Sequence, residues 1–238
     1  MLHEMKQLCP PPCDNDVKPA GRQRSIVDAG SLVRMTPAVR PVTRRDIPVF
    51  ARTLADAFFD DPVMMWMWPD DERRRRGLPR MFAAEARHHL LAHGGLEIAE
   101  GPDGATGGAT MWAPPGRWEV TGWRSVLVTA GMIHALGGRA RVGAEVNGAL
   151  EDAHPAEPHW YLSAIGTGNA TRGGGFGKAL LRSRLDRCDA EGVPAYLESS
   201  KEKNISYYER FGFRVTGEIA VPNGGPTLWK MWRAPVTR

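Results

Sequence analysis

The sequence predicts a mixed α/β domain of the α+β kind, in which short strands are interspersed with amphipathic helices. Runs rich in β-branched and aromatic residues alternate with segments whose apolar residues recur every three or four positions. A glycine-rich segment, residues 172–177, lies between one such strand and one such helix. The 238 residues are 42% hydrophobic and 24% charged, which is typical of a globular chain that buries a core without disulfides.

Composition and charge argue against several classes of protein. The net charge of +4 is too diffuse to indicate a nucleic-acid partner, although it mildly favours an anionic ligand. No apolar run approaches the ~20 residues that a membrane-spanning helix needs. Cys9, Cys13 and Cys188 are too few and too unevenly spaced for a disulfide framework, and the N-terminus lacks the apolar core of a signal peptide. We therefore expect a cytoplasmic protein that binds neither membrane nor nucleic acid.

The chain is predicted to have a tail followed by one domain. Residues 1–35 combine proline, glycine and mixed charge without sustained periodicity, so we expect them to be disordered. Residues 36–238 are predicted to form a single domain with a helical insert at about 118–153.

The first half of this domain is predicted from periodicity and turn residues. Asp46 stands where a first-turn acid belongs, and apolar residues follow it at helical spacing up to Phe58. Gly94 and Gly95 end the second helix. The predicted elements are a strand at 39–42, a helix from 46 to the Asp60-Asp61-Pro62 turn, a helix at 72–93, and strands at 96–100 and 107–112.

The second half alternates between the two periodicities. Helices at 120–136 and 142–153 are separated by Gly137 and Gly138 and make up the insert. Leu181, Leu185 and Cys188 define the apolar face of a later helix. The remaining predicted elements are a strand at 159–167, that helix at 176–191, a strand at 195–199, a short helix at 205–210 and closing strands at 214–221 and 227–232.

The segment from Arg172 to Lys178 has the features of a phosphate-binding loop. Glycines let the backbone approach a ligand closely, and the N-terminus of the following helix presents free N–H groups and the positive end of its dipole. The spacing does not match a P-loop, which would need glycine at 172 and Ser or Thr at 179. Nor does it match a dinucleotide fingerprint, which would need glycine at 178 or 180. A purely structural glycine turn is the alternative.

What the segment does match is Arg-x-x-Gly-x-Gly, which resembles the coenzyme pyrophosphate loop of the GCN5-related N-acetyltransferase (GNAT) superfamily. Downstream, Asn204, then Tyr208 four residues later, then Glu-Arg-Phe-Gly-Phe are similar to the second half of the same fold. Residues 52–58, 159–162 and 192–213 are also similar to the puromycin N-acetyltransferases of that superfamily. The resemblance extends over 39–232 and implies a mixed, mostly antiparallel, twisted sheet flanked by helices. In that fold the strands at 159–167 and 195–199 splay apart.

The resemblance also implies a reaction, the transfer of an acetyl group from acetyl-CoA without a metal. Glu198 matches the carboxylate that takes the proton of the acceptor's ammonium group, usually through water, and Tyr208 matches the acid beside the sulfur. Because a phenol is a weaker acid than a thiol by ~1.5 pKa units, we expect Tyr208 to hydrogen-bond the developing thiolate as much as to protonate it. The residues that match coenzyme contacts are Ile165, Gly166, Thr167, Arg172, Gly173, Gly174, Gly175, Phe176, Gly177, Lys178, Asn204 and Tyr208.

Each of these roles has a structural alternative. Glu198 could be a salt-bridged strand carboxylate, and Tyr208 a packed aromatic. Thr167 stands where the superfamily usually has a branched apolar residue, and Gly174 where it often has a basic one, with Lys178 as a replacement. These two departures favour a competing hypothesis, a non-catalytic module that only holds coenzyme or ligand.

The acceptor pocket is expected between the first two helices and the insert. The side chains that would wall it are Phe58, Phe59, Trp66, Trp112 and Tyr161, although each of them could equally belong to the core. Asp60 and Asp61 could attract a cationic amine or simply end the first helix. His89 and His93 stand four apart but lack the glutamate of a zinc site, so they are predicted to be a surface pair.

The favoured hypothesis is an acetyl-CoA-dependent N-acetyltransferase that acts on the primary amine of a small molecule, such as an antibiotic or a related metabolite. A protein or peptide amine is the alternative acceptor. We expect a monomer or a homodimer. The reaction class follows from the family, whereas the identity of the amine does not.

Overall fold

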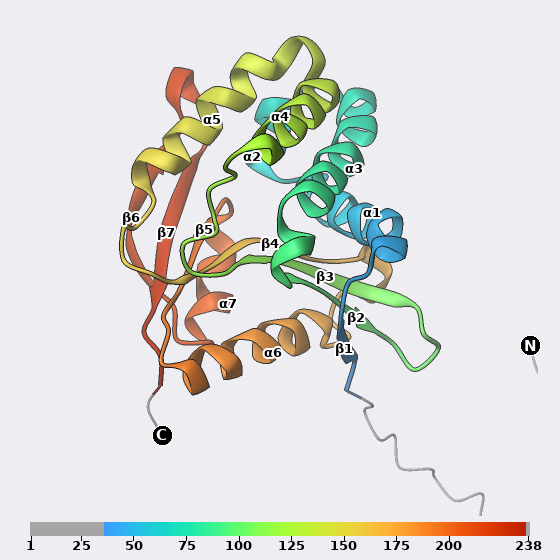
Figure 1. Cartoon of the computed structure of the whole chain (residues 1–238), viewed down its shortest axis with the longest axis vertical. Helices are drawn as coiled ribbons and strands as arrows, with labels where there is room; N and C mark the ends of the chain where they lie inside the picture. The colour runs from blue at the N-terminus through green and yellow to red at the C-terminus, as the bar shows by residue number, and fades with distance from the viewer. Residues whose placement is uncertain (1–35, 237–238) are drawn as a thin grey trace, which may run out of the picture. The chain divides into compact units, whose positions relative to one another are not determined.

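The computed structural model of the chain describes residues 36–236 and is built on a seven-stranded sheet with the order β1-β2-β3-β4-β5-β7-β6 (Figure 1). Neighbouring strands are antiparallel, except for the parallel pair β4 and β5. This confirms the predicted fold class. The strands are β1 (Ala38–Pro41), β2 (Leu96–Glu100), β3 (Thr106–Ala113), β4 (Trp160–Thr167), β5 (Ala195–Ser199), β6 (Arg214–Ala220) and β7 (Thr227–Arg233).

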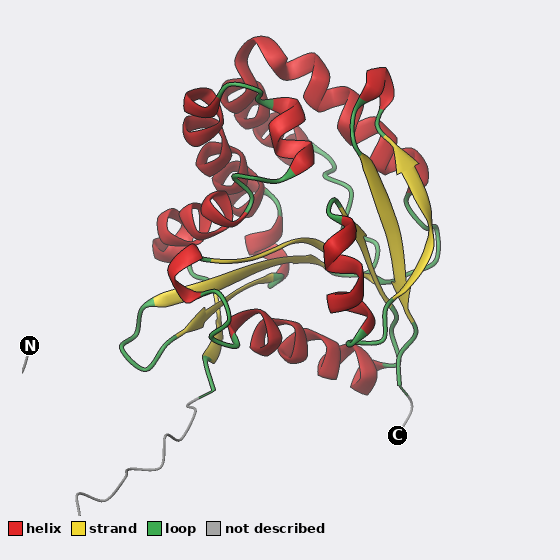
Figure 2. Cartoon of the chain, turned by 180° about the vertical axis from the view of Figure 1, so that it is seen from behind, coloured by secondary structure: helices red, strands yellow, loops and turns green. Residues whose placement is uncertain are grey.

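Helices cover both faces of this sheet (Figure 2). α1 (Ile47–Ala57) packs on β3 and β4 and is itself covered by α3 (Asp71–His88), while α6 (Phe176–Glu191) packs on the other face against β2, β3 and β4. The other α-helices are α2 (Pro62–Met67), α4 (Trp123–Leu136), α5 (Ala140–Ala153) and α7 (Ile205–Glu209). The short 3-10 helices are η1 (Arg44–Asp46), η2 (Leu90–His93), η3 (Gly137–Arg139), η4 (Asn169–Thr171), η5 (Glu202–Asn204) and η6 (Pro222–Gly224).

The sheet separates two hydrophobic cores. Alternation along β3 points Met111 into the core under α1 and α3, whereas Trp112 points into the core under α6. Both side chains are fully buried. Leu181 and Leu185 supply the α6 side of the second core, as their helical spacing predicts. Each fully buried leucine contributes about 2 kcal/mol to folding by removal of apolar surface from water.

The elements lie close to their predicted positions, with two differences in the first half. The Asp60-Asp61-Pro62 turn ends α1, as expected, but it also starts α2: the Asp61 carboxylate accepts hydrogen bonds from the backbone N–H groups of Val63 and Met64 at 3.0 and 3.4 Å. The long helix predicted at 72–93 ends at His88, and η2 continues the chain to Gly94, which takes the left-handed conformation with φ 64°.

The sheet opens between β4 and β5. The two strands pair from Trp160 to Leu162, opposite Ala195 to Leu197, and then part. A β-bulge accompanies the opening, because Met111 of β3 pairs with Ala164 whereas Trp112 pairs with Leu162, which leaves Ser163 as the extra residue. Leu162 therefore belongs to the α6 core and Ala164 to the α1 core, although they are two residues apart.

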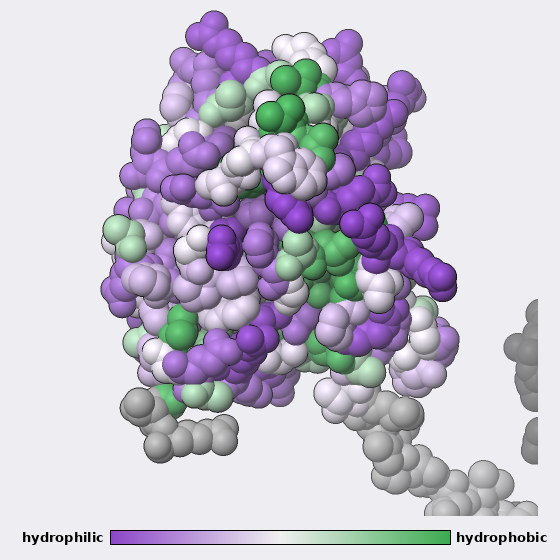
Figure 3. Space-filling model, viewed as in Figure 1, coloured by the Kyte–Doolittle hydropathy of each residue, from purple (hydrophilic) through white to green (hydrophobic). Residues whose placement is uncertain are grey.

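The surface carries an apolar patch on the insert. Trp123, Val126 and Ile133 of α4 are exposed, Trp123 by 69%. Figure 3 shows green residues in its upper part, where Figure 1 places α4. Within residues 36–236, none of the helices has the length and apolar character needed to cross a membrane. The tail predicted for residues 1–35, with Cys9 and Cys13, lies outside the described residues.

Candidate active site

A cavity of about 80 Å³ lies where β4 and β5 part. The walls come from the post-bulge half of β4, the end of β5, the C-terminal end of α1, and α7. The cavity brings together Ile165, Glu198, Asn204 and Tyr208, which the sequence predicts to act together, with Phe58, the predicted acceptor-wall residue that follows α1. The opening exists because the parallel pairing stops after Leu162, not because side chains are missing from a continuous sheet.

Glu198 is the carboxylate of this cavity. It alternates on β5 with Leu197 and Ser199, so it shares its face of the sheet with Tyr196 and, across the parallel pair, with Tyr161. The side chain is only 4% exposed. Burial raises the pKa of Glu198 to about 7, although the Tyr161 and Tyr196 hydroxyls partly offset this effect. Among the described residues, no partner hydrogen-bonds its Oε1.

Tyr208 approaches the cavity from the opposite side of the sheet. It lies on α7, and its ring packs against Phe213 and Tyr207 at centroid distances of 6.1 and 5.7 Å, at the edge of the α6 core. Burial first, and then electrostatic interaction with Tyr207 and Asp61, raise the pKa of Tyr208 well above its ordinary value. The phenol therefore stays protonated and available as a donor.

Two aspartates tie α1 and α2 to the end of β5. Asp61 accepts a hydrogen bond from the Ser200 hydroxyl in addition to capping α2, and burial raises its pKa. Asp60 pairs with Lys201, whose Nζ lies 2.7 Å from the carboxylate. Both carboxylates are thus engaged with protein groups at the rim of the cavity, as anchors of the loop that follows β5.

The glycine-rich segment lies where β4 leads into α6, beyond the cavity. Gly173 and Gly175 have positive φ angles of 85° and 86°, a conformation that other residues adopt only with strain. A Cβ on Gly174 would lie 2.8 Å from the Phe176 ring and 3.0 Å from the Thr171 carbonyl. None of the described side chains caps the N-terminus of α6, so its first N–H groups have no side-chain acceptor. This cradle fits a pyrophosphate.

The other predicted coenzyme residues have different surroundings. Arg172 and Lys178 are exposed, and the Arg172 guanidinium donates to Asn169 Oδ1 at 3.0 Å. The Phe176 ring turns inward, over Gly107 and Gly108 of β3, so it anchors the loop and only its backbone faces outward. Gly166 lies under Ala57 of α1, Thr167 and Gly177 are half-buried neighbours, and Asn204 precedes α7.

Only some of the side chains predicted to wall the acceptor pocket lie at the cavity. Phe58 lines the cavity and Tyr161 lies beside Glu198. Phe59 is covered by Arg74, whose guanidinium lies 4.4 Å from the ring centroid, and Trp66 approaches Gly225. Trp112 does not belong to the wall: it points into the α6 core, on the far side of the sheet, because the alternation of β3 turns it there.

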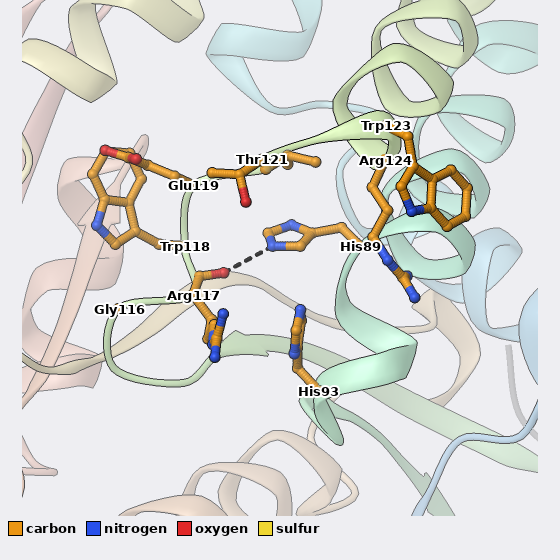
Figure 4. A pocket seen from close by; sticks show the side chains of 10 residues that line it. His89, His93, Gly116, Arg117, Trp118, Glu119, Thr121, Trp123 and Arg124 are labelled. Atoms are coloured by element: carbon orange, nitrogen blue, oxygen red, sulfur yellow. Dashed lines mark hydrogen bonds between the residues drawn. The ribbon is translucent and has the colours of Figure 1, made fainter.

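A larger pocket of about 460 Å³ lies between the end of α3 and the loop that leads into the insert (Figure 4). Its lining residues are His89, His93, Gly116, Arg117, Trp118, Glu119, Val120, Thr121, Trp123 and Arg124. His89 is buried, and its Nε2 lies 2.8 Å from the Arg117 carbonyl, so the prediction of a surface pair is wrong for His89. Burial lowers the pKa of both histidines.

Sequence reasoning missed this pocket and the cluster behind it. The ring of Trp118 stacks on His154 at 3.8 Å, and His154 Nδ1 lies 3.9 Å from Glu198 Oε1. A second carboxylate, the half-buried Glu85 of α3, lies near Ser163 at the bulge, and burial raises its pKa to about 7. The one signal in the sequence was the pair of histidines at 154 and 159, both just before β4.

Within residues 36–236, no three His, Cys, Asp or Glu side chains are grouped so that they could hold a metal ion. Cys188 is buried in the α6 core, where burial raises the pKa of its thiol to about 12.

Comparisons with known proteins agree with this geometry. A family model described as the acetyltransferase (GNAT) family matches residues 130–213. An uncharacterized N-acetyltransferase of Schizosaccharomyces pombe is 31% identical over 188 residues, which are 74% of this chain and 74% of that protein.

Two solved structures share the fold. A chain described as histone acetyltransferase HPA2 and related acetyltransferase, from Corynebacterium glutamicum, aligns with a TM-score of 0.64 at 24% identity and covers 86% of this chain and 99% of its own. The polyamine N-acetyltransferase of Drosophila melanogaster aligns with a TM-score of 0.56 at 14% identity. The alignment covers 83% of this chain and 99% of the Drosophila chain.

Proposed function

The chain belongs to the GNAT acetyltransferase family, and on that premise we propose that it transfers an acetyl group from acetyl-CoA to the primary amine of a small molecule. The observation that carries the proposal is the cavity between β4 and β5. The buried carboxylate of Glu198 and the half-buried phenol of Tyr208 reach this one opening from the two sides of the sheet.

Glu198 acts as the general base. An aliphatic ammonium group must lose a proton before its nitrogen can attack, and a carboxylate with a pKa of about 7 is a far stronger base than an exposed one. The proton moves from the ammonium nitrogen to a Glu198 oxygen, directly or through one water. Because only ionised Glu198 can accept it, activity rises as the pH rises through about 7.

Tyr208 acts at the opposite side of the opening. Its raised pKa keeps the hydroxyl protonated, and so available as a hydrogen-bond donor, beside the sulfur. As the carbon–sulfur bond breaks, the Tyr208 O–H donates a hydrogen bond to the developing thiolate. Because a thiolate is a weaker base than a phenolate, this hydrogen bond stabilises the leaving sulfur at least as much as proton transfer does.

Acetyl-CoA supplies the thioester, whose carbonyl carbon receives the amine and whose sulfur leaves. The N–H groups at the start of α6, with Arg172 and Lys178 nearby, would hold the pyrophosphate. The unpaired edge of β4 at Ile165, Gly166 and Thr167 would bind the pantetheine arm as an added strand, together with Asn204. One N–H of this edge polarises the thioester carbonyl.

A small amine is the acceptor that suits the site best. The cavity is narrow, its base is buried, and Phe58 and Tyr161 give it apolar walls. The Drosophila structural neighbour is named for polyamine acetylation, so the fold accommodates amines of this size. Similarity at 52–58, 159–162 and 192–213 makes amino-bearing antibiotics such as puromycin the first acceptors to try. We place the enzyme in the cytoplasm, as a monomer or homodimer.

The test measures thiol release from acetyl-CoA with a panel of acceptors. The panel contains puromycin, other amino-bearing antibiotics, a polyamine, an arylalkylamine and a lysine peptide. Release with one small amine that is lost in Tyr208→Phe supports the proposal. Release with the peptide alone would overturn the acceptor class, and neither turnover nor calorimetric binding of acetyl-CoA would overturn the function.

A further inference from the structure

A chain of polar contacts runs behind Glu198, away from the cavity. His159 Nδ1 lies 2.6 Å from the backbone carbonyl of Glu157, and His159 Nε2 lies 3.0 Å from His154 Nε2. The other nitrogen of His154, Nδ1, lies 3.9 Å from Glu198 Oε1. The side chain of His154 is only 3% exposed, and His159 is buried.

These contacts determine where the protons are. A carbonyl oxygen can only accept, so His159 Nδ1 carries a hydrogen and donates to Glu157. The second nitrogen of a neutral imidazole is then a lone pair, so His159 Nε2 accepts from His154 Nε2–H. By the same rule, Nδ1 of neutral His154 carries no hydrogen. The chain of contacts therefore ends in a nitrogen without hydrogen, 3.9 Å from Glu198 Oε1.

Packing keeps the ring of His154 in this orientation. Trp118 stacks on one side, and Tyr161 and Tyr196 meet the ring edge-on at centroid distances of 4.8 and 5.2 Å. A ring flipped by 180° would present carbon to His159 and lose that hydrogen bond. Burial, and then His159, lower the pKa of His154 to about 4, so it is neutral at physiological pH.

The other groups that face Glu198 account for the rest of its environment. Tyr161 of β4 and Tyr196 of β5 offer hydroxyls, and Lys230 of β7, its partner in register, offers a distant positive charge. Beyond Tyr161 stands the half-buried Glu85 of α3. Among the described residues, Glu198 Oε1 remains without a hydrogen-bond donor, and the nitrogen that faces it cannot supply one.

We propose that Glu157, His159 and His154 form a tautomer lock that keeps Glu198 a strong base. The inference rests on the proposed role of Glu198. If Nδ1 of His154 carried a hydrogen, it would donate to the carboxylate and stabilise the ionised form, which would weaken the base. With a bare Nδ1, the carboxylate lacks this donor, and the proton taken from the acceptor amine gains an acceptor on its far side. His154 and His159 are thus positioning residues.

The experiment compares two variants of a residue that does not touch Glu198. In His159→Phe, the aromatic packing is kept but the acceptor for His154 Nε2–H is lost, so His154 is free to carry its hydrogen on Nδ1. The acidic limb of the kcat/KM profile should move down by about one pH unit, which raises kcat/KM at pH 5.5 about tenfold relative to its plateau. In His159→Gln, a side-chain carbonyl can replace the acceptor, and the limb should stay within about 0.3 units.

The control is His134→Gln, which removes an exposed histidine from α4 and should leave the profile unchanged. The proposal would be overturned if the acidic limb of the kcat/KM profile did not move in folded His159→Phe. It would also be overturned if the limb moved equally in His159→Phe and His159→Gln.

A second measurement does not depend on turnover. Nitrogen-15 NMR of the imidazole groups in the unmodified protein reports which nitrogen of His154 carries hydrogen. Hydrogen on Nε2 is the expected result, and hydrogen on Nδ1 would refute the lock even if the variants fail to fold. Should the protein turn over no amine, the proposed function falls, while this spectrum still decides the state of His154.

Discussion

The cavity between β4 and β5 and the larger pocket at the end of α3 differ in size and in chemistry, and the proposed reaction takes place in the smaller one. The cavity between β4 and β5 is about 80 Å³, whereas the pocket below the insert is about 460 Å³. The small cavity is formed by strands that stop pairing, and its Glu198 and Tyr208 are buried enough for their pKa values to rise. The large pocket is formed by an irregular loop, with an exposed Arg117 beside two histidines (Figure 4).

The two regions differ in which groups are desolvated. Burial makes the carboxylate of Glu198 in the small cavity a stronger base, whereas in the large pocket it makes His89 and His93 weaker bases. Trp118 connects the two regions, because it lines the large pocket and stacks on His154 behind Glu198. Substitutions in each region should therefore have separable effects.

The largest effect is expected from Glu198→Gln. Loss of the general base should reduce kcat by about 10²- to 10⁴-fold and remove the acidic limb near pH 7, with little change in acetyl-CoA binding. Steady-state kinetics across pH 5–9 measures this. The matched control is Glu218→Gln, an exposed carboxylate on β6. Retained activity in folded Glu198→Gln would show that the cavity is not the reactive region.

Tyr208→Phe should lower kcat by about 10²-fold, because the leaving sulfur loses its hydrogen-bond donor. The KM for acetyl-CoA should change less than threefold. Tyr207→Phe, which removes a hydroxyl from the neighbouring residue of α7, is the control. Equal losses in the two variants would instead indicate that α7 as a whole has moved.

Glu85 lies between the two regions, and substituting it is expected to change the free energy of unfolding of the protein. Its folded pKa of about 7 exceeds the unfolded value near 4.5, so the stabilisation from binding a proton is present below pH 4.5 and is lost as the pH rises through 7. Glu85→Gln should therefore raise the free energy of unfolding by about 2 kcal/mol at pH 8 and much less at pH 4.5. Urea unfolding at both pH values tests this, and an equal change at both would contradict the buried charge.

Gly175→Ala should raise the KM for acetyl-CoA about tenfold while kcat changes little, because φ 86° is strained for alanine and the strain opens the cradle at the start of α6. Gly104→Ala is the control: φ is 75° there, in the turn between β2 and β3, so the loss of stability should be similar without a change in KM. If the KM for acetyl-CoA rose tenfold in both Gly175→Ala and Gly104→Ala, the rise would be explained by lost stability and not by the cradle at the start of α6.

Arg117→Gln should have the smallest effect. An exposed guanidinium at the large pocket repels a cationic acceptor weakly, so its removal should lower the KM for a polyamine about twofold at low salt and not at 0.5 M salt. The KM for acetyl-CoA should not change. A 100-fold loss of turnover in Arg117→Gln would instead indicate that the reaction takes place in the large pocket.

Local patterns determined the elements and the family. Apolar spacing predicted α6 and strands β2 and β5 at their observed boundaries, because helix and strand periodicities are properties of neighbouring residues. The glycine-rich segment at 172–177 and the pair Glu198 and Tyr208 likewise stand in short stretches that the family shares. Of the α-helices and strands within residues 36–236, only α2 was missed, since Asp61-Pro62 suits the end of one helix and the cap of the next equally well.

Tertiary structure alone decided which side chains meet. The bulge at Ser163 reverses the faces of β4, and the alternation of β3 sends Trp112 to the α6 core rather than to the acceptor. The contact of His154 with Glu198 joins the end of the insert to β5. Such contacts depend on sheet register and on the burial that follows from it, which no window of sequence contains, and that burial is what raises the pKa of Glu198.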